Sequence, residues 1–280
     1  MAERFSAFSF VDRITRLEPG VRVEGRYAVP SGATRFPASL MAEAVGQLAA
    51  WAAMSRLDFT RRPVAGLAAE TLYHGAAAPG QTLDLEADIQ SCDAEAIAYG
   101  GKARVEGACV LELRHCVGPM LPMEEFDAPE AVRADFETLR GPGAPANRFH
   151  GVDAPEIRVI EHAAGERLRA ELIVPASAPF FADHFPRRPV FPGTLLLDSQ
   201  ADLALRLARE AAPLRAAPNL APSRVTDVKI RSFTPPGQTL EIRVELMSAT
   251  ADGATLSVAA RAEGKVVATA RIEIAPRRPM

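Results

Sequence analysis

The stretch FFADHFPRRPVFPGTLLLD, residues 180–198, places a single histidine in a proline-rich loop directly before an apolar run. Prolines at 186, 189 and 192 fix the backbone φ angle and stiffen the loop around His184. The leucines after Gly193 predict a buried helix over 194–208. A lone histidine among phenylalanines is more often structural than catalytic, so the surrounding sequence must decide between the two.

The same chain contains a second, related copy of this region. FPGTLLLDSQADLA (191–204) aligns with FPASLMAEAVGQLA (36–49) at an offset of 155 residues. At an offset of 157, PGQTLDLEADI (79–89) matches PGQTLEIRVEL (236–246), and ARVEG (103–107) matches ARAEG (260–264). The order is the same in both halves, which indicates a tandem duplication. It predicts a first domain over 1–117, a Pro- and Gly-rich linker over 118–151, and a second domain over 152–280.

Each half has one apolar helix and several segments with alternating apolar residues, which are typical of strands. This pattern predicts the α+β class with antiparallel sheets. The first helix, expected over 39–54, is apolar nearly all round and should therefore be buried. A helix wrapped by its own sheet fits that expectation.

The bulk composition excludes some functions. With 280 residues, 48% apolar residues and a net charge of −3, nothing favours nucleic acid or a membrane surface as a partner. No run is long and uncharged enough for a membrane span, and the charged N-terminus does not resemble a signal peptide. The sparse cysteines, Cys92, Cys109 and Cys116, show no paired spacing, so we expect a reduced, cytoplasmic protein.

The loop pattern H-F-P-x-x-P-V-x-P-G-x-L-x-x-(E/D), which runs from His184 to Asp198, resembles the signature of the β-hydroxyacyl-acyl-carrier-protein dehydratases of fatty acid synthesis. VTDVKIRSFTPPGQTL (225–240), FVDRITRLEPG (10–20) and PASLMAEAVGQ (37–47) extend the resemblance to both halves. It implies the hotdog fold, a curved antiparallel sheet around one long helix. It also implies that the tandem copies form a double hotdog, a covalent pseudo-dimer whose catalytic groups come from different halves.

Dehydration of a β-hydroxyacyl thioester needs a base, an acid and a donor for the thioester oxygen. His184 suits the base, and the resemblance gives the Gly193 N–H, at the start of its helix, the role of donor. Glu43 in the first half lies at the position of Asp198 and shares a helix face with Gln47. We therefore predict Glu43 as the acid, and Gly193, Gln47, Phe181 and Val190 as substrate-binding residues.

The halves have diverged in a complementary way. The offset between them grows from 145 at Val29-Pro30 to 155 at Phe36-Pro37, so the first half lacks ten residues that include the histidine loop. The second half keeps His184 and Gly193, whereas the first keeps Glu43 and Gln47. Alternatives remain open: Glu43 could be a leftover buried carboxyl, and Arg187 and Arg188 could bind a phosphopantetheine phosphate or an acidic carrier, or simply be solvated.

These expectations describe a dehydratase of fatty acid or polyketide biosynthesis that forms trans-2-enoyl thioesters without a metal or redox cofactor. Its partner would be acyl carrier protein, which holds the small acyl substrate on phosphopantetheine, with coenzyme A as the less favoured carrier. A homo-oligomer of pseudo-dimers is left open. The rival hypotheses are a hotdog thioesterase and a non-catalytic acyl-binding hotdog protein.

Overall fold

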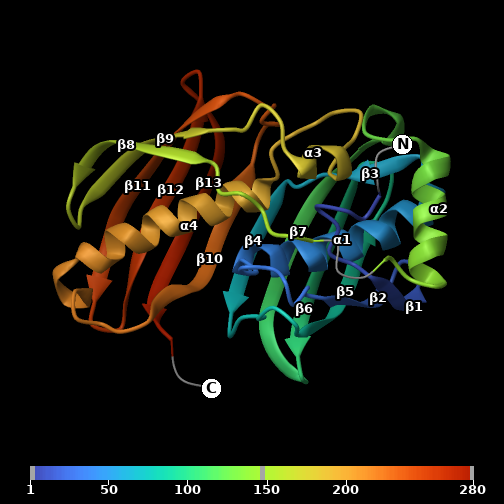
Figure 1. The fold of residues 1–280 in the computed structure, drawn as a ribbon, viewed down its shortest axis with the longest axis horizontal. Helices are drawn as coiled ribbons and strands as arrows, with labels where there is room; N and C mark the ends of the chain where they lie inside the picture. The colour runs from blue at the N-terminus through green and yellow to red at the C-terminus, as the bar shows by residue number, and fades with distance from the viewer. Residues whose placement is uncertain (1–3, 146–148, 278–280) are drawn as a thin grey trace.

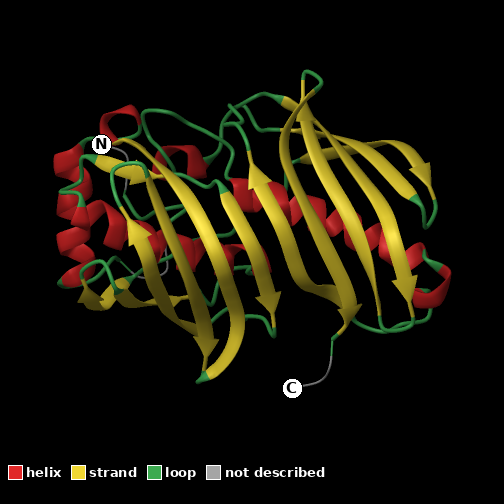
Figure 2. Cartoon of the chain, turned by 180° about the vertical axis from the view of Figure 1, so that it is seen from behind, coloured by secondary structure: helices red, strands yellow, loops and turns green. Residues whose placement is uncertain are grey.

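The computed structural model describes residues 4–145 and 149–277. It is an α+β fold in which one antiparallel sheet of thirteen strands is covered on one face by helices (Figure 1). Seen from behind, the opposite face of the sheet is bare and the long helices lie beyond it (Figure 2). The predicted fold class is confirmed.

The first half contains seven strands and one long helix. They are β1 (Arg13–Glu18), β2 (Arg22–Ala28), α1 (Ala38–Arg56), β3 (Arg61–Pro63), β4 (Leu67–Tyr73), β5 (Thr82–Cys92), β6 (Ala96–Val105) and β7 (Ala108–Pro122).

The second half repeats the plan without a counterpart of β3. Its elements are β8 (Glu156–Ala163), β9 (Arg167–Ile173), α3 (Pro179–Asp183), α4 (Gly193–Glu210), η2 (Ala212–Leu214), β10 (Leu220–Ile230), β11 (Thr239–Thr250), β12 (Gly253–Ala262) and β13 (Lys265–Pro276).

The strand order shows the duplication in space. It runs β1-β2-β5-β6-β7-β4-β10-β13-β12-β11-β9-β8, so the two halves have mirrored orders on either side of the centre. The halves join where β4 pairs antiparallel with β10, with Thr71 opposite Val225 and Ala68 opposite Val228. This pairing makes a single sheet of two hotdogs and covers two strand edges that would otherwise be open. The expected double hotdog is therefore present, and its two sheets join edge to edge.

The two long helices form the centre of each core. Leu40, Met41, Val45 and Leu48 of α1 are completely or almost completely buried against the first sheet half. Gly101 of β6 permits this close packing, because a Cβ there would lie 2.5 Å from a methyl carbon of Val45. The sheet itself alternates buried and half-buried residues, most regularly along β12, as a sheet with one covered face requires.

The helices meet only at their N-terminal turns. From the middle of the molecule α1 and α4 run in opposite directions (Figure 1). Thr194 at the start of α4 contacts Glu43 in the second turn of α1, while Asp198 in the second turn of α4 contacts Arg35 just before α1. These contacts join the N-terminal turns of the two helices at the centre of the molecule.

The segment 118–151, expected as a linker, is more structured than its composition indicated. Its first residues continue β7 to Pro122, and η1 (Met123–Glu125) and α2 (Pro129–Arg140) follow. Phe136 of α2 packs on Trp51 and Phe59, with ring centroids 6.3 and 5.4 Å away. The segment thus adds a helix to the first half, and the domain limits at 117 and 152 stay a prediction.

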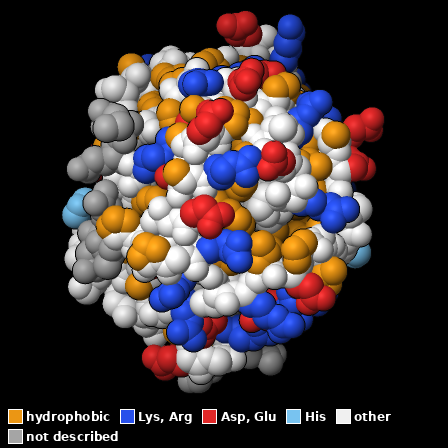
Figure 3. All heavy atoms as spheres, turned by 90° about the vertical axis from the view of Figure 1, so that its right-hand side faces the viewer, with side chains coloured by type: hydrophobic (Ala, Val, Ile, Leu, Met, Phe, Trp, Pro, Cys, Tyr) orange, Lys and Arg blue, Asp and Glu red, His pale blue; other side chains and the backbone are white. Residues whose placement is uncertain are grey.

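The surface carries mixed charge. On the end of the molecule that lies on the right of Figure 1, acidic and basic side chains are interspersed with apolar ones (Figure 3). No helix within residues 4–145 and 149–277 combines the length and the apolar character that a membrane crossing needs.

Candidate active site

The His184 imidazole is held at the end of the short helix α3. The His184 N–H donates to the Phe180 carbonyl at 2.8 Å, and the ring stacks on Phe185 with centroids 4.1 Å apart. Nδ1 lies 3.5 Å from the Val190 carbonyl oxygen, at the long limit of a hydrogen bond. Because a carbonyl only accepts, this contact places the proton on Nδ1 and leaves the Nε2 lone pair free.

The loop around the histidine is conformationally strained. Phe185 has φ +70°, a left-handed value that is uncommon for a bulky residue. The Arg187 N–H donates to the Phe126 carbonyl at 2.9 Å and the Arg188 N–H to the Phe185 carbonyl at 3.0 Å, which hold this turn. The phenyl ring is buried against Phe126, with centroids 4.8 Å apart. Strain of this kind persists only where the surroundings fix it, and it often accompanies a functional site.

The Glu43 carboxyl reaches the second half from the first. Its Oε1 accepts a hydrogen bond from Gln47 Nε2 at 3.0 Å, and its Oε2 accepts one from Thr194 Oγ1 at 2.8 Å. Burial raises the pKa of Glu43 above its ordinary value, although these two hydrogen bonds and the charge of Arg62 oppose the rise. Burial of a carboxyl favours its protonated form, which is the form that a general acid requires.

Gly193 is the first residue of α4 and lies beside Thr194. Its N–H points out of the helix start without an intrahelical partner. A Cβ at this position would meet Ile230 only at an ordinary 3.5 Å, so packing within the chain does not demand a glycine. The missing side chain instead leaves room for a ligand to approach this N–H.

Arg62 of β3 acts by its charge on both candidate catalytic groups. Its guanidinium carbon is 4.7 Å from the centroid of the Phe185 ring, on which His184 stacks. Its positive charge lowers the pKa of both His184 and Glu43. Burial is the larger cause for His184, and together the two effects lower its pKa to about 3, so the imidazole is neutral at pH 7.

The N-terminal segment 5–10 closes the site. The Asp183 carboxylate accepts hydrogen bonds from the N–H groups of Phe5, Ala7 and Phe8 at 2.8–3.0 Å. The Phe8 ring lies edge-on to His184 at 5.1 Å, and the Phe8 carbonyl accepts from Gln47 Nε2. Gln47 also accepts from the Phe10 N–H at 2.8 Å. One chain of contacts therefore runs from His184 through Phe8 and Gln47 to Glu43.

Comparisons with known proteins show which family this chain resembles. A family model for ApeI dehydratases matches residues 160–271, which include His184 and Gly193. A FabZ 3-hydroxyacyl-acyl-carrier-protein dehydratase of Pseudoalteromonas translucida is 30% identical over 147 residues, which cover 47% of this chain and 98% of the relative. The FabZ of Anaeromyxobacter dehalogenans is 35% identical over 123 residues, which cover 40% of this chain and 74% of the relative.

The chain belongs to the FabZ dehydratase family.

Solved structures show the double-hotdog fold across nearly the whole chain. The tesB protein of Mycobacterium avium subspecies paratuberculosis superposes with a TM-score of 0.59 at 17% identity and covers 94% of both chains. An oleoyl thioesterase of Lactobacillus plantarum gives 0.60 at 12% identity, over 93% of this chain and 98% of its own. At such low identity these likenesses concern the fold alone, and they say nothing of the reaction of this FabZ-family chain.

The residues that correspond by the duplication to Glu43 and Thr194 lie on the other side of the contact between α1 and α4. Asp198, which corresponds to Glu43, pairs with Arg35 at 2.9 Å. Ser39 corresponds to Thr194 and faces the Asp198 carboxyl. Asp198 thus lies beside the short segment of the first half that replaces the histidine loop. The structure brings Glu43, and not Asp198, to Thr194 and Gly193.

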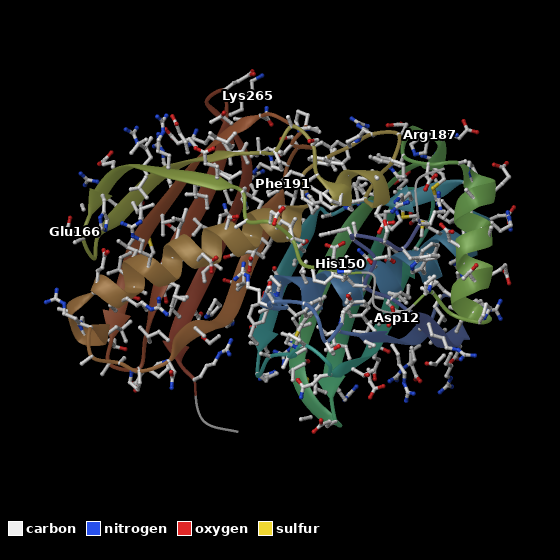
Figure 4. The ribbon with its side chains drawn as sticks, viewed as in Figure 1. Asp12, His150, Glu166, Arg187, Phe191 and Lys265 are labelled. Atoms are coloured by element: carbon white, nitrogen blue, oxygen red, sulfur yellow. The ribbon has the colours of Figure 1, made fainter. Side chains whose placement is uncertain are left out.

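The remaining predicted residues lie around the loop. Phe181 is buried and packs on Phe180, with centroids 4.6 Å apart. Val190 is buried as well, in a small cluster with Val64, Phe126 and Phe185. Phe191 lies near the start of α4, whereas Arg187 lies at the periphery (Figure 4). A substrate role for Phe181, Val190 and Gln47 stays a prediction.

Sequence reasoning missed Arg62, Asp183 and Thr194. Asp183 directly precedes His184, and Thr194 directly follows Gly193. Their position next to a predicted site residue could have identified them. Arg62 carries no such signal, because only the fold brings β3 beside the histidine loop.

Proposed function

We propose that the protein removes water from β-hydroxyacyl thioesters and forms trans-2-enoyl thioesters. The observation that carries this proposal is the hydrogen bond from Thr194 to Glu43, which holds an acid of one half beside Gly193 of the other. The chain of contacts from His184 through Phe8 and Gln47 to Glu43, and the charge of Arg62 on both groups, support a shared site. The family relatives carry the name dehydratase.

In this reaction His184 removes the proton at the α-carbon. Its Nδ1–H contact to Val190 leaves Nε2 as the acceptor, and its lowered pKa keeps it neutral. The charge that develops on the thioester oxygen is stabilised by the Gly193 N–H at the positive end of α4.

Glu43 completes the elimination. Its proton passes to the β-hydroxyl, the carbon–oxygen bond breaks, and water leaves. Burial raises the pKa of Glu43 and so favours the protonated form that delivers this proton. After one turnover His184 has gained the α-proton and Glu43 has lost its own, so a net proton transfer between them or through water restores the site. No metal or redox cofactor enters this scheme.

The proposed carrier is acyl carrier protein, as in the names of the relatives. Arg187 and Arg188 lie on the histidine loop and are exposed. Arg188 already pairs with Glu125 at 2.7 Å and lies 4.4 Å from the Phe233 ring centroid, so Arg187 is the freer cation for an acidic carrier or its phosphopantetheine phosphate.

The test uses β-hydroxyacyl groups of several chain lengths on acyl carrier protein and follows the acyl mass. We expect a loss equal to one water, and His184→Ala should reduce the rate by ~10²–10⁴ while thermal unfolding stays cooperative. Release of the free acid would instead identify a thioesterase. Binding without turnover at every chain length would favour a non-catalytic acyl-binding protein.

A further inference from the structure

A cavity of about 680 Å³ lies at the pseudo-symmetric counterpart of the candidate active site. The first half contributes Arg35, Phe36 and Ser39, and α4 contributes Asp198 and Leu205. Its size falls within the range of small-molecule sites. None of its lining residues belongs to the candidate catalytic site on the other side of the helix contact.

The deletion in the first half explains why space remains here. In the second half, α3 and the histidine loop pack Phe180, Phe181 and Phe185 around the start of α4. The first half lacks ten residues at this point, and Arg35 and Phe36 line the cavity beside the start of α1. The loss of the loop therefore removed a histidine and left a hollow.

The interior of the cavity offers polar groups as well as apolar walls. Ser39 is only 4% exposed, and its hydroxyl faces the Asp198 carboxyl. The carboxyl of Asp198 lies beside it, and burial raises the pKa of that carboxyl to about 6. The apolar walls come from both halves: Phe36, Ala38, Leu197, Leu205, Leu220 and Val225.

The charges that line the cavity are predominantly basic. Arg35, Arg209 and Arg277 face two carboxylates, Asp198 and Asp202. Arg35 lies within ion-pair distance of both of them. Arg209 and Arg277 make no direct ion pair with any residue in 4–145 or 149–277, and the charge of Arg209 acts on Asp202 from a longer distance. Apolar walls combined with three guanidinium groups against two carboxylates suit an amphipathic anion.

We propose that this cavity binds an acyl chain that carries an anionic head group. The chain lies along the apolar walls, and Arg209 and Arg277 hold the head group. No reaction occurs here, because the histidine loop is missing. The anion has two possible sources, a free fatty acid or the phosphate of an acyl phosphopantetheine.

The test measures binding to the full chain by calorimetry, with decanoate in one arm and S-decyl phosphopantetheine, an unreactive thioether, in the other. The variant Arg209→Ser/Arg277→Ser removes the two unpaired charges. Arg206→Ser is the matched control, because Arg206 is exposed on the same helix and does not line the cavity. Dehydration of a β-hydroxyacyl substrate is measured in parallel.

We expect the double variant to weaken at least one of the two ligands about tenfold or more, since each guanidinium contributes a charge-assisted hydrogen bond. Arg206→Ser should bind as the parent does, and neither variant should alter dehydration. Weakened decanoate alone identifies a fatty acid site, and weakened thioether alone identifies a phosphopantetheine site. Equal affinity in all three proteins, or no binding of either ligand, overturns the proposal whether or not the protein is a dehydratase.

Discussion

At the scale of single residues, the two pseudo-equivalent carboxyls have separate surroundings. Glu43 contacts Thr194, next to Gly193, whereas Asp198 pairs with the exposed Arg35. Glu43→Gln keeps the shape and removes the transferable proton, so we predict that it lowers kcat by at least ~10². Asp198→Asn, its matched control, should leave kcat within a few-fold of the parent. If Asp198→Asn loses activity and Glu43→Gln keeps it, the acid is Asp198 and the prediction of Glu43 is wrong.

The pKa shifts of His184 and Glu43 predict the pH dependence of kcat. The active form has neutral His184 and protonated Glu43. Because burial and Arg62 lower the pKa of His184 to about 3, the acid limb of kcat should lie well below the ordinary histidine value of 6.5. Because burial raises the pKa of Glu43, activity should fall only as the pH rises through that raised value.

Arg62 makes this profile testable by substitution. Its charge lowers the pKa of both groups, so Arg62→Met should shift both limbs of the kcat profile to higher pH. Arg61→Met, on the neighbouring position of the same strand, is the control and should shift neither. The profiles are measured with saturating substrate, and limbs that stay in place in folded Arg62→Met would show that the charge does not act on this site.

The site illustrates how far a sequence alone can reach. His184, Gly193 and Glu43 could be proposed as site residues because a fixed loop spacing and a repeat offset point to them. Arg62 could not, because its influence depends on burial and on the approach of β3 to Phe185, which local sequence does not encode. The hydrogen bonds of Gln47 to backbone groups of Phe8 and Phe10 were equally hidden.

At the scale of elements, the N-terminal segment depends on one carboxylate. Asp183, at the end of α3, accepts three backbone hydrogen bonds from residues 5–8. We predict that Asp183→Asn lowers the free energy of unfolding by about 1–3 kcal/mol, because these N–H groups lose a charged acceptor. It should also speed amide hydrogen exchange at residues 5–8. The exposed Asp252→Asn is the control, and unchanged exchange in Asp183→Asn would contradict this role.

The elements that the sequence predicted best are those with strong periodicity. The helix expected over 39–54 spans Ala38–Arg56, and the one expected over 194–208 spans Gly193–Glu210. The structure of 118–151 was missed because Pro and Gly dominate its composition. Apolar residues of α2, such as Phe136, pack on Trp51 and Phe59, which are distant in the sequence, so local sequence does not reveal their partners.

At the scale of the whole molecule, each half is incomplete in two ways. One half holds the proposed acid and the other holds the histidine and the oxyanion glycine, and β4 and β10 cover each other's edges. The halves are therefore expected to need each other for both chemistry and solubility.

Two fragments test this dependence: residues 1–145 and residues 146–280, expressed separately and mixed. We predict that the mixture forms a one-to-one complex by size-exclusion chromatography and recovers dehydration, whereas fragment 1–145 alone has none. Fragment 146–280 could pair with itself through β10 and place Asp198 where Glu43 would lie, so its activity should be far below that of the mixture. Asp198→Asn in that fragment serves as the control for any residual turnover. If fragment 146–280 alone is as active as the mixture, Glu43 is not needed and the shared site is wrong.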